Sequence, residues 1–105
     1  MFGKKYKKIS PEEAISIMDA GAVILLDVRT KEEYAVGHIK NSVLLTNTEI
    51  ADKAATVLPD KDAKIIVYCA SGMRSAGAAK LLAKMGYKNV FDMGGLVTWP
   101  YGTVM

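Results

Sequence analysis

The sequence predicts an α/β fold with a largely parallel sheet, and two observations lead to this class. Apolar stretches such as 22–27 and 65–68 are continuous rather than alternating, which is typical of strands covered on both faces of a sheet. Segments with helix-start signals stand between these stretches, so that strand and helix patterns alternate along the chain. Such alternation is typical of parallel strands joined by right-handed crossovers.

Four segments carry helix signals. They are residues 10–21, 30–36, 46–57 and 76–85. The first two open with capping boxes, at Ser10–Glu13 and Thr30–Glu33, in which each end residue accepts the backbone N–H of the other through its side chain. Glycines follow both of these helices, as is usual at helix ends. The third segment has a threonine available as its cap, and the fourth is rich in alanine and leucine.

Five segments are expected to form strands. They are residues 6–9, 22–27, 38–45, 65–69 and 89–92. Parallel strands bring their carboxyl ends to one edge of the sheet, where ligands of such folds bind. Asp27, Cys69 and Asp92 are therefore expected to lie along that edge. Gly94 and Gly95 are expected to form a tight bend after the last strand.

Length and composition predict a single domain over residues 1–105, with a core over about 6–101 and a basic tail over 1–5. Half of the residues are apolar, which is enough for a core without disulfides or metals. The single cysteine excludes an internal disulfide and suits a reducing compartment, so we expect a cytoplasmic protein unless a signal peptide has been removed. No stretch is long and apolar enough to span a membrane.

The net charge of +3 includes a cluster of four lysines between positions 4 and 8. We interpret this cluster as a solvated, solubilising tail, because lysines without a nucleic-acid motif are weak evidence for nucleic-acid binding. We therefore expect neither a nucleic-acid partner nor a membrane partner. The mild positive balance would still help to attract small anions.

The stretch from Ile65 to Ser75 carries the strongest chemical signal. An apolar strand ends at Cys69, a Cys-x-x-Gly-x-Arg-Ser loop follows, and a helix comes next. Backbone N–H groups of such a loop, at the start of a helix, form a cradle for an anion. A thiol in that cradle is expected to ionise easily, and the thiolate is its reactive form. We predict Cys69 as the catalytic residue and, as its binding loop, Ala70, Ser71, Gly72, Met73, Arg74 and Ser75.

These residues also have purely structural interpretations. A lone cysteine such as Cys69 is often a small buried hydrophobe at a strand end. Arg74 either binds an anionic substrate or the charged sulfur, or is a solvated charge at a helix start. The Ser71 and Ser75 hydroxyls are candidate donors to the sulfur, and Ser75 is equally a candidate for the N-cap of the helix. The spacing of the loop residues favours chemistry, because that spacing has a mechanism behind it.

Asp27 and Arg29 are predicted to support the site from the end of the strand 22–27. Asp27 either accepts N–H groups of the loop or is a turn residue. Arg29 is expected to form a structural ion pair with Glu33. His38 is expected to order a turn rather than act as a base, because a stabilised thiolate needs none. One cysteine and one histidine cannot form a closed zinc site, so no metal is expected.

In the order and spacing of its motifs, the chain resembles the rhodanese family in its small single-domain form. The resemblance covers about Ile9 to Trp99. The matching segments are Leu26–Arg29, Glu33–Tyr34, Gly37–Ile39, Val67–Ser75, Gly86–Tyr87, Asn89–Val90, Gly94–Gly95 and Trp99. Each segment is short, but their order and spacing together are specific.

The resemblance implies a doubly wound α/β domain, in which helices cover both faces of a five-stranded, mostly parallel sheet. It also implies a sulfurtransferase. Cys69 would take a sulfane sulfur from thiosulfate, polysulfide or a persulfide donor, become a persulfide itself, and pass the sulfur to cyanide or to a thiol of a small molecule or a protein. The donor would be a small anion, and neither a cofactor nor a metal is implied.

The chain departs from the family pattern at two places. Members that favour thiosulfate often carry more than one cation in the loop, whereas here Arg74 is alone, which leaves the preferred donor open. The family often reads Pro-Gly-Ala after Gly37–Ile39, and this chain reads Lys-Asn-Ser at 40–42, so the local backbone is expected to differ.

Three other functions stay open at this point. A cysteine phosphatase or arsenate reductase has the same fold, but its cysteine and arginine are separated by a longer stretch than the four residues between Cys69 and Arg74. A non-catalytic binding or regulatory module would not need the cysteine. A dedicated sulfur carrier would form the persulfide without steady turnover on small acceptors.

Overall fold

Five parallel strands form one sheet in the computed structural model, which describes residues 5–105. Their order across the sheet is β1, β5, β4, β2 and β3. Their bounds are β1 Lys7–Lys8, β2 Ile24–Asp27, β3 Val43–Leu44, β4 Lys64–Cys69 and β5 Asn89–Gly95. All of the described strand pairs are parallel, which confirms the predicted α/β class.

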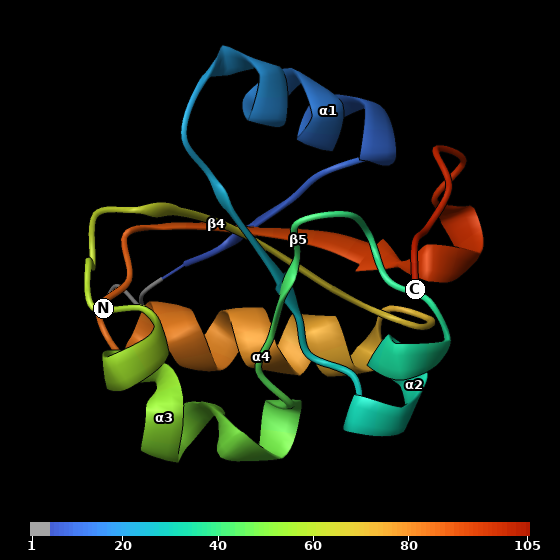
Figure 1. Ribbon diagram of the computed structural model, residues 1–105. Coiled ribbons are helices and arrows are strands. Elements are labelled where there is room, and N and C mark those ends of the chain that lie inside the picture. Colours follow the sequence, from blue (N-terminus) through green and yellow to red (C-terminus); the bar gives the residue numbers. More distant parts are fainter. Residues whose placement is uncertain (1–4) are drawn as a thin grey trace.

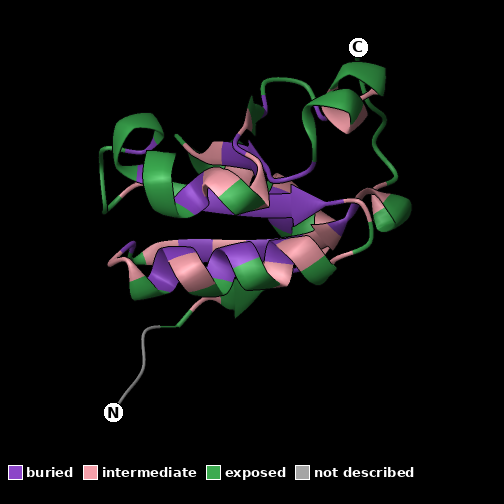
Figure 2. Cartoon of the chain, turned by 90° about the horizontal axis from the view of Figure 1, so that it is seen from below, coloured by how far each residue is buried: buried purple, intermediate pink, exposed green. Residues whose placement is uncertain are grey.

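Helices cover both faces of the sheet: α1 lies on one face, and α2, α3 and α4 lie on the other (Figure 1). The helices are α1 Pro11–Ala20, α2 Lys31–Val36, α3 Ile50–Val57 and α4 Met73–Lys84, with 3₁₀ turns η1 Asn47–Glu49 and η2 Leu96–Thr98. The apolar runs are therefore covered on both sides, as their lack of alternation predicts. Buried residues concentrate on the sheet, and exposed ones on the outer helix surfaces and loops (Figure 2).

The central strand β4 contributes to two apolar clusters, one on each face. Ile65, Val67 and Cys69 belong to the cluster packed against α3 and α4. Ile66 and Tyr68 belong to the cluster on the α1 side. This division follows from the two-residue period of a strand, and it points the Cys69 side chain toward the face that carries α4.

Both predicted capping boxes are present. Ser10 Oγ accepts the N–H of Glu13 at 3.0 Å, and Glu13 Oε1 accepts the N–H of Ser10 at 2.9 Å. Thr30 and Glu33 repeat the pattern at 3.2 and 3.0 Å. Each box joins residues three positions apart, so the sequence alone contains both partners.

The last strand differs from its prediction. β5 continues through Gly94 and Gly95, where a tight bend was expected. Val67 pairs with Asp92 and Tyr68 pairs with Gly94, so one extra residue of β5 is accommodated as a bulge. Gly94 has φ of +89°, a conformation that favours glycine, and the Asp92 carboxylate accepts its N–H at 2.9 Å. The glycines therefore shape the end of a strand rather than terminate it.

Three other boundaries also shift. The third strand is reduced to β3, because the chain from His38 to Ser42 forms a bridge to Val104 and a turn. The third helix is preceded by η1, and α4 begins three residues before the predicted Ala76. Of the predicted basic tail, residues 1–4 lie outside the described part of the chain. Within residues 5–105, no helix is both long and apolar enough to cross a membrane.

Candidate active site

Cys69 is the last residue of β4, and two backbone amides of the following loop point at its sulfur. The N–H of Gly72 lies 3.0 Å from Sγ, and the N–H of Ser75 lies 3.3 Å away. The cysteine is fully buried and also borders the apolar cluster under α4. The sulfur is therefore buried in the core, as the structural interpretation of Cys69 predicts. It also accepts two N–H groups, as the catalytic interpretation predicts.

Gly72 makes this short loop possible. It is the N-cap of α4 and has φ of +112°, a backbone angle that residues with a β-carbon rarely adopt. The Ser75 hydroxyl donates to the carbonyl of Gly72 at 3.0 Å and to that of Gly94 at 3.4 Å. Both predicted roles of this hydroxyl are therefore wrong, because it neither bonds the sulfur nor caps the helix. It holds the loop closed and ties the loop to β5.

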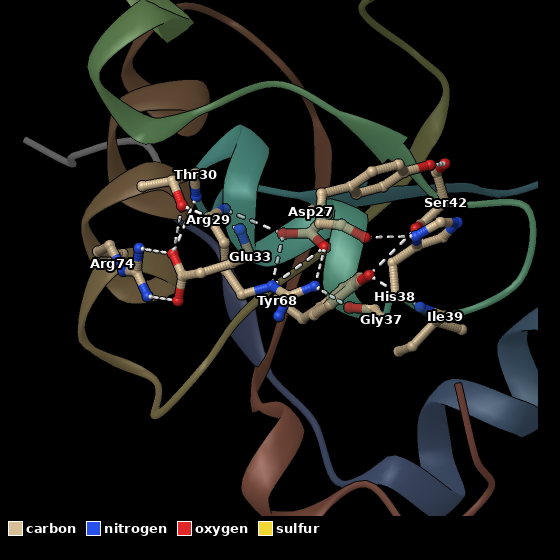
Figure 3. A network of polar contacts seen from close by, with 11 residues as sticks. Asp27, Arg29, Thr30, Glu33, Gly37, His38, Ile39, Ser42, Tyr68 and Arg74 are labelled. Atoms are coloured by element: carbon tan, nitrogen blue, oxygen red, sulfur yellow. Dashed lines mark hydrogen bonds and ion pairs between the residues drawn. The ribbon is translucent and has the colours of Figure 1, made fainter. Parts of the chain in front are cut away.

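Arg74 forms a bidentate ion pair with Glu33 of α2 (Figure 3). Nη1 and Nη2 lie 2.7 and 2.9 Å from the two carboxylate oxygens, and both side chains are about one-third exposed. The Arg74 guanidinium, together with the N–H of Thr30, lowers the pKa of Glu33 to about 2. The hydrogen bonds to Glu33 in turn raise the pKa of Arg74. The predicted Arg29–Glu33 pair is wrong, because Glu33 pairs with the loop instead.

Arg29 pairs with Asp27, and both residues are buried. The Asp27 carboxylate accepts the backbone N–H of Arg29 at 2.9 Å and its Nη2 at 2.7 Å, with Nε at 3.0 and 3.1 Å (Figure 3). Nη2 also donates to the carbonyl of Gly37 at 2.6 Å. The hydrogen bonds described for the Asp27 carboxylate all come from Arg29, so the expected contact with the N–H groups of the loop is not formed. The pair instead joins the end of β2 to the end of α2.

Tyr68 is a buried polar residue that the sequence analysis did not single out. Its hydroxyl accepts the N–H of Ile39 at 3.1 Å and lies 3.0 Å from Ser42 Oγ. Burial raises the pKa of Tyr68 to about 12. His38 packs nearby, with its ring stacked on Tyr34 at 3.7 Å and Nδ1 2.8 Å from the Tyr34 carbonyl. These contacts agree with the structural role expected of His38, and they order the segment that carries Ile39 and Ser42.

Two hollows flank the rim of the loop. One, of about 520 Å³, lies between the outer side of the loop at Ser71–Met73 and the end of β5. The other, of about 310 Å³, is lined by Met73, Arg74 and Asn47. Met73 stands between them and is 84% exposed. Among residues 5–105, no three His, Cys, Asp or Glu side chains gather into a metal-binding group.

Comparisons with known sequences and solved structures match this chain to a single family. The sequence model of the family described as "Rhodanese-like domain" matches residues 10–100. The thiosulfate sulfurtransferase GlpE of Pseudomonas entomophila is 38% identical over 96 residues, which cover 90% of this chain and 85% of that protein. GlpE of Haemophilus influenzae is 40% identical over 95 residues, with coverages of 90% and 88%. A solved rhodanese-related protein from Thermoplasma volcanium is 32% identical, with a TM-score of 0.81 and coverages of 94% and 98%.

Proposed function

This chain belongs to the rhodanese family, and we propose that it is a sulfurtransferase that carries a sulfane sulfur on Cys69. The observation that carries the proposal is the pair of N–H groups, from Gly72 and Ser75, that converge on Sγ. Nothing in a merely structural cysteine requires two amide donors. The names of the relatives, which are thiosulfate sulfurtransferases, support the same class of reaction.

The reaction proceeds in two displacements. The Cys69 thiolate attacks the outer sulfur of the donor, a new S–S bond forms on Cys69, and the S–S bond of the donor breaks to release sulfite from thiosulfate or a thiolate from a persulfide. A thiolate or cyanide then attacks the terminal sulfur of the Cys69 persulfide and regenerates the thiolate. Electron pairs balance in each step, so no redox cofactor takes part.

The loop supplies the electrostatic stabilisation for both steps. The N–H groups of Gly72 and Ser75 are held in place by the Ser75 hydroxyl and by the start of α4, so they need no reorganisation when negative charge moves onto sulfur. The amino end of α4 adds positive potential at the same place. Cys69 has no exposed surface in this conformation, so the groups that cover its sulfur must move aside to admit a donor.

Intact-mass measurement tests this function directly. The protein is treated with thiosulfate, with polysulfide and with an organic persulfide, and we expect a mass gain of one sulfur atom that cyanide reverses. Cys69→Ser is the matched control and should gain nothing. Equal gain in Cys69→Ser, or no gain with any donor, would overturn the proposal.

Turnover measurements then define the acceptor. Continuous turnover with a small thiol or cyanide identifies an enzyme, whereas a stable persulfide that leaves only on contact with a protein thiol identifies a dedicated carrier. The thiol acceptor, the cytoplasmic location and the single domain over residues 1–105 stay predictions of the sequence. Hydrolysis of an aryl phosphate that depends on Cys69 would support a phosphatase instead.

A further inference from the structure

The only cationic side chain of the active-site loop, that of Arg74, is already paired with a carboxylate. Arg74 is the one basic residue between Ala70 and Ser75, and both of its terminal amino groups bond the two carboxylate oxygens of Glu33. A planar guanidinium matched to a carboxylate in this way is the strongest form of such a pair. The guanidinium N–H groups that an anionic donor would bind therefore point toward α2 (Figure 3).

Glu33 is itself held in place from its own helix. Its Oε1 accepts the N–H and the hydroxyl of Thr30, both at 3.0 Å, as part of the capping box of α2. The neighbouring Arg29 is likewise paired, with Asp27. The described charges next to Arg74 therefore form two neutral pairs, and neither arginine contributes a net positive charge to the mouth of the loop.

This arrangement affects donors differently according to their charge. When thiosulfate meets the Cys69 thiolate, three negative charges gather at the loop. Two amides and the amino end of α4 stabilise them, but no uncompensated arginine does. An organic persulfide is mostly a monoanion at neutral pH, so at most two negative charges gather when it meets the same thiolate. The persulfide therefore depends less than the dianion on a free cation.

We propose that Glu33 is a specificity-determining residue that, by pairing with Arg74, disfavours thiosulfate and adapts the site to organic persulfide donors. This inference rests on the proposed sulfur transfer and names its donor class. Glu33 acts through Arg74 and does not touch the donor.

Glu33→Gln is the test variant and Glu32→Gln is its control. Glutamine at position 33 can keep the capping box, because Glu and Gln both serve in that motif, but it removes the charge that occupies Arg74. Glu32 is on the same helix, exposed, and has the same charge, so its replacement reproduces the change in net charge alone. For each protein, kcat/KM is measured with thiosulfate and with an alkyl hydropersulfide.

We expect Glu33→Gln to raise the thiosulfate-to-persulfide ratio of kcat/KM about fivefold, in line with the free energy of a partly exposed ion pair. Glu32→Gln should leave this ratio unchanged. The inference is overturned if Glu33→Gln leaves the ratio unchanged, or if the wild-type protein uses thiosulfate as efficiently as the persulfide.

Two further measurements keep the test decisive. Thiosulfate binding to Cys69→Ser, with and without Glu33→Gln, is measured by calorimetry. Tighter binding in the double variant supports the role of Glu33 even if sulfur transfer itself fails, and equal binding contradicts it. If Glu33→Gln does not fold, Met73→Lys adds an unpaired cation at the same rim and should raise the ratio in the same direction; no rise would contradict the inference.

Discussion

The open side of Gly95, where other residues carry a β-carbon, faces the carbonyl group of Ala70 at the base of the loop that follows Cys69. A β-carbon at position 95 would collide with the Ala70 carbonyl oxygen and would lie 2.7 Å from its carbonyl carbon and from the α-carbon of Ser71. Gly95 has an extended backbone with φ of −111°, so close approach rather than backbone conformation requires glycine here. The loop therefore packs directly against the end of β5.

Gly95→Ala should therefore displace the loop. We expect the rate of persulfide formation to fall at least about tenfold, because relieving so close an overlap shifts the loop by roughly 1 Å and misaligns the amides of Gly72 and Ser75. Gly77→Ala is the control, since Gly77 lies in α4 with no atom near its added methyl. The control should keep its activity and gain about 0.5–1 kcal/mol in unfolding free energy. Persulfide formation at the wild-type rate in Gly95→Ala would contradict this account.

Because the Asp27–Arg29 pair is buried, we expect removal of one partner to lower the free energy of unfolding strongly. Asp27→Asn keeps the shape of the side chain but leaves the Arg29 guanidinium buried without a counter-charge, and we expect a loss of about 3–5 kcal/mol in unfolding free energy. Urea denaturation measures this loss. Asp27→Asn combined with Arg29→Gln should cost less than the sum of the two single changes. Strict additivity would show that the two residues are not coupled.

Tyr68 predicts a loss of stability in alkali. Burial raises its pKa from 10 to about 12 in the folded state, so the stabilisation is complete below pH 10 and is lost as the pH rises toward 12. Tyr68→Phe should lack this part of the alkaline decline. At neutral pH it should cost about 1–2 kcal/mol, because Ile39 N–H loses its acceptor. Identical alkaline profiles for the two proteins would contradict the prediction.

Glu33 predicts a loss of stability in acid. Pairing with Arg74 lowers its pKa from 4.5 to about 2, so the stabilisation is present above pH 4.5 and is lost as the pH falls toward 2. Unfolding free energies measured across this range should decline less steeply for Glu33→Gln than for the wild type. The difference should shrink with added salt, because the pair is partly exposed. Parallel declines at low salt would show that the pair does not contribute.

Local signals account for the parts of the fold that were predicted correctly. The capping boxes at Ser10 and Thr30 join residues three positions apart, and the apolar run that ends at Cys69 is continuous in the chain. The α/β class, the helix starts of α1 and α2 and the placement of the cysteine at a strand end follow from such patterns. The loop after Cys69 could be recognised for the same reason, because all of its donors follow the cysteine within six positions.

Long-range choices were decided only by the tertiary structure. Arg74 and Glu33 are separated by 41 positions, and the sequence offers Arg29 as an equally reasonable partner for Glu33. The bulge in β5 and the contact of Gly95 with Ala70 likewise depend on how two strands meet. The sequence by itself determined the α/β class, the starts of α1 and α2 and the place of Cys69 at a strand end, because those depend on neighbouring residues. Which charges neutralise each other around that sulfur depended on packing, because hydrogen bonds form between whichever groups the folded chain brings within reach.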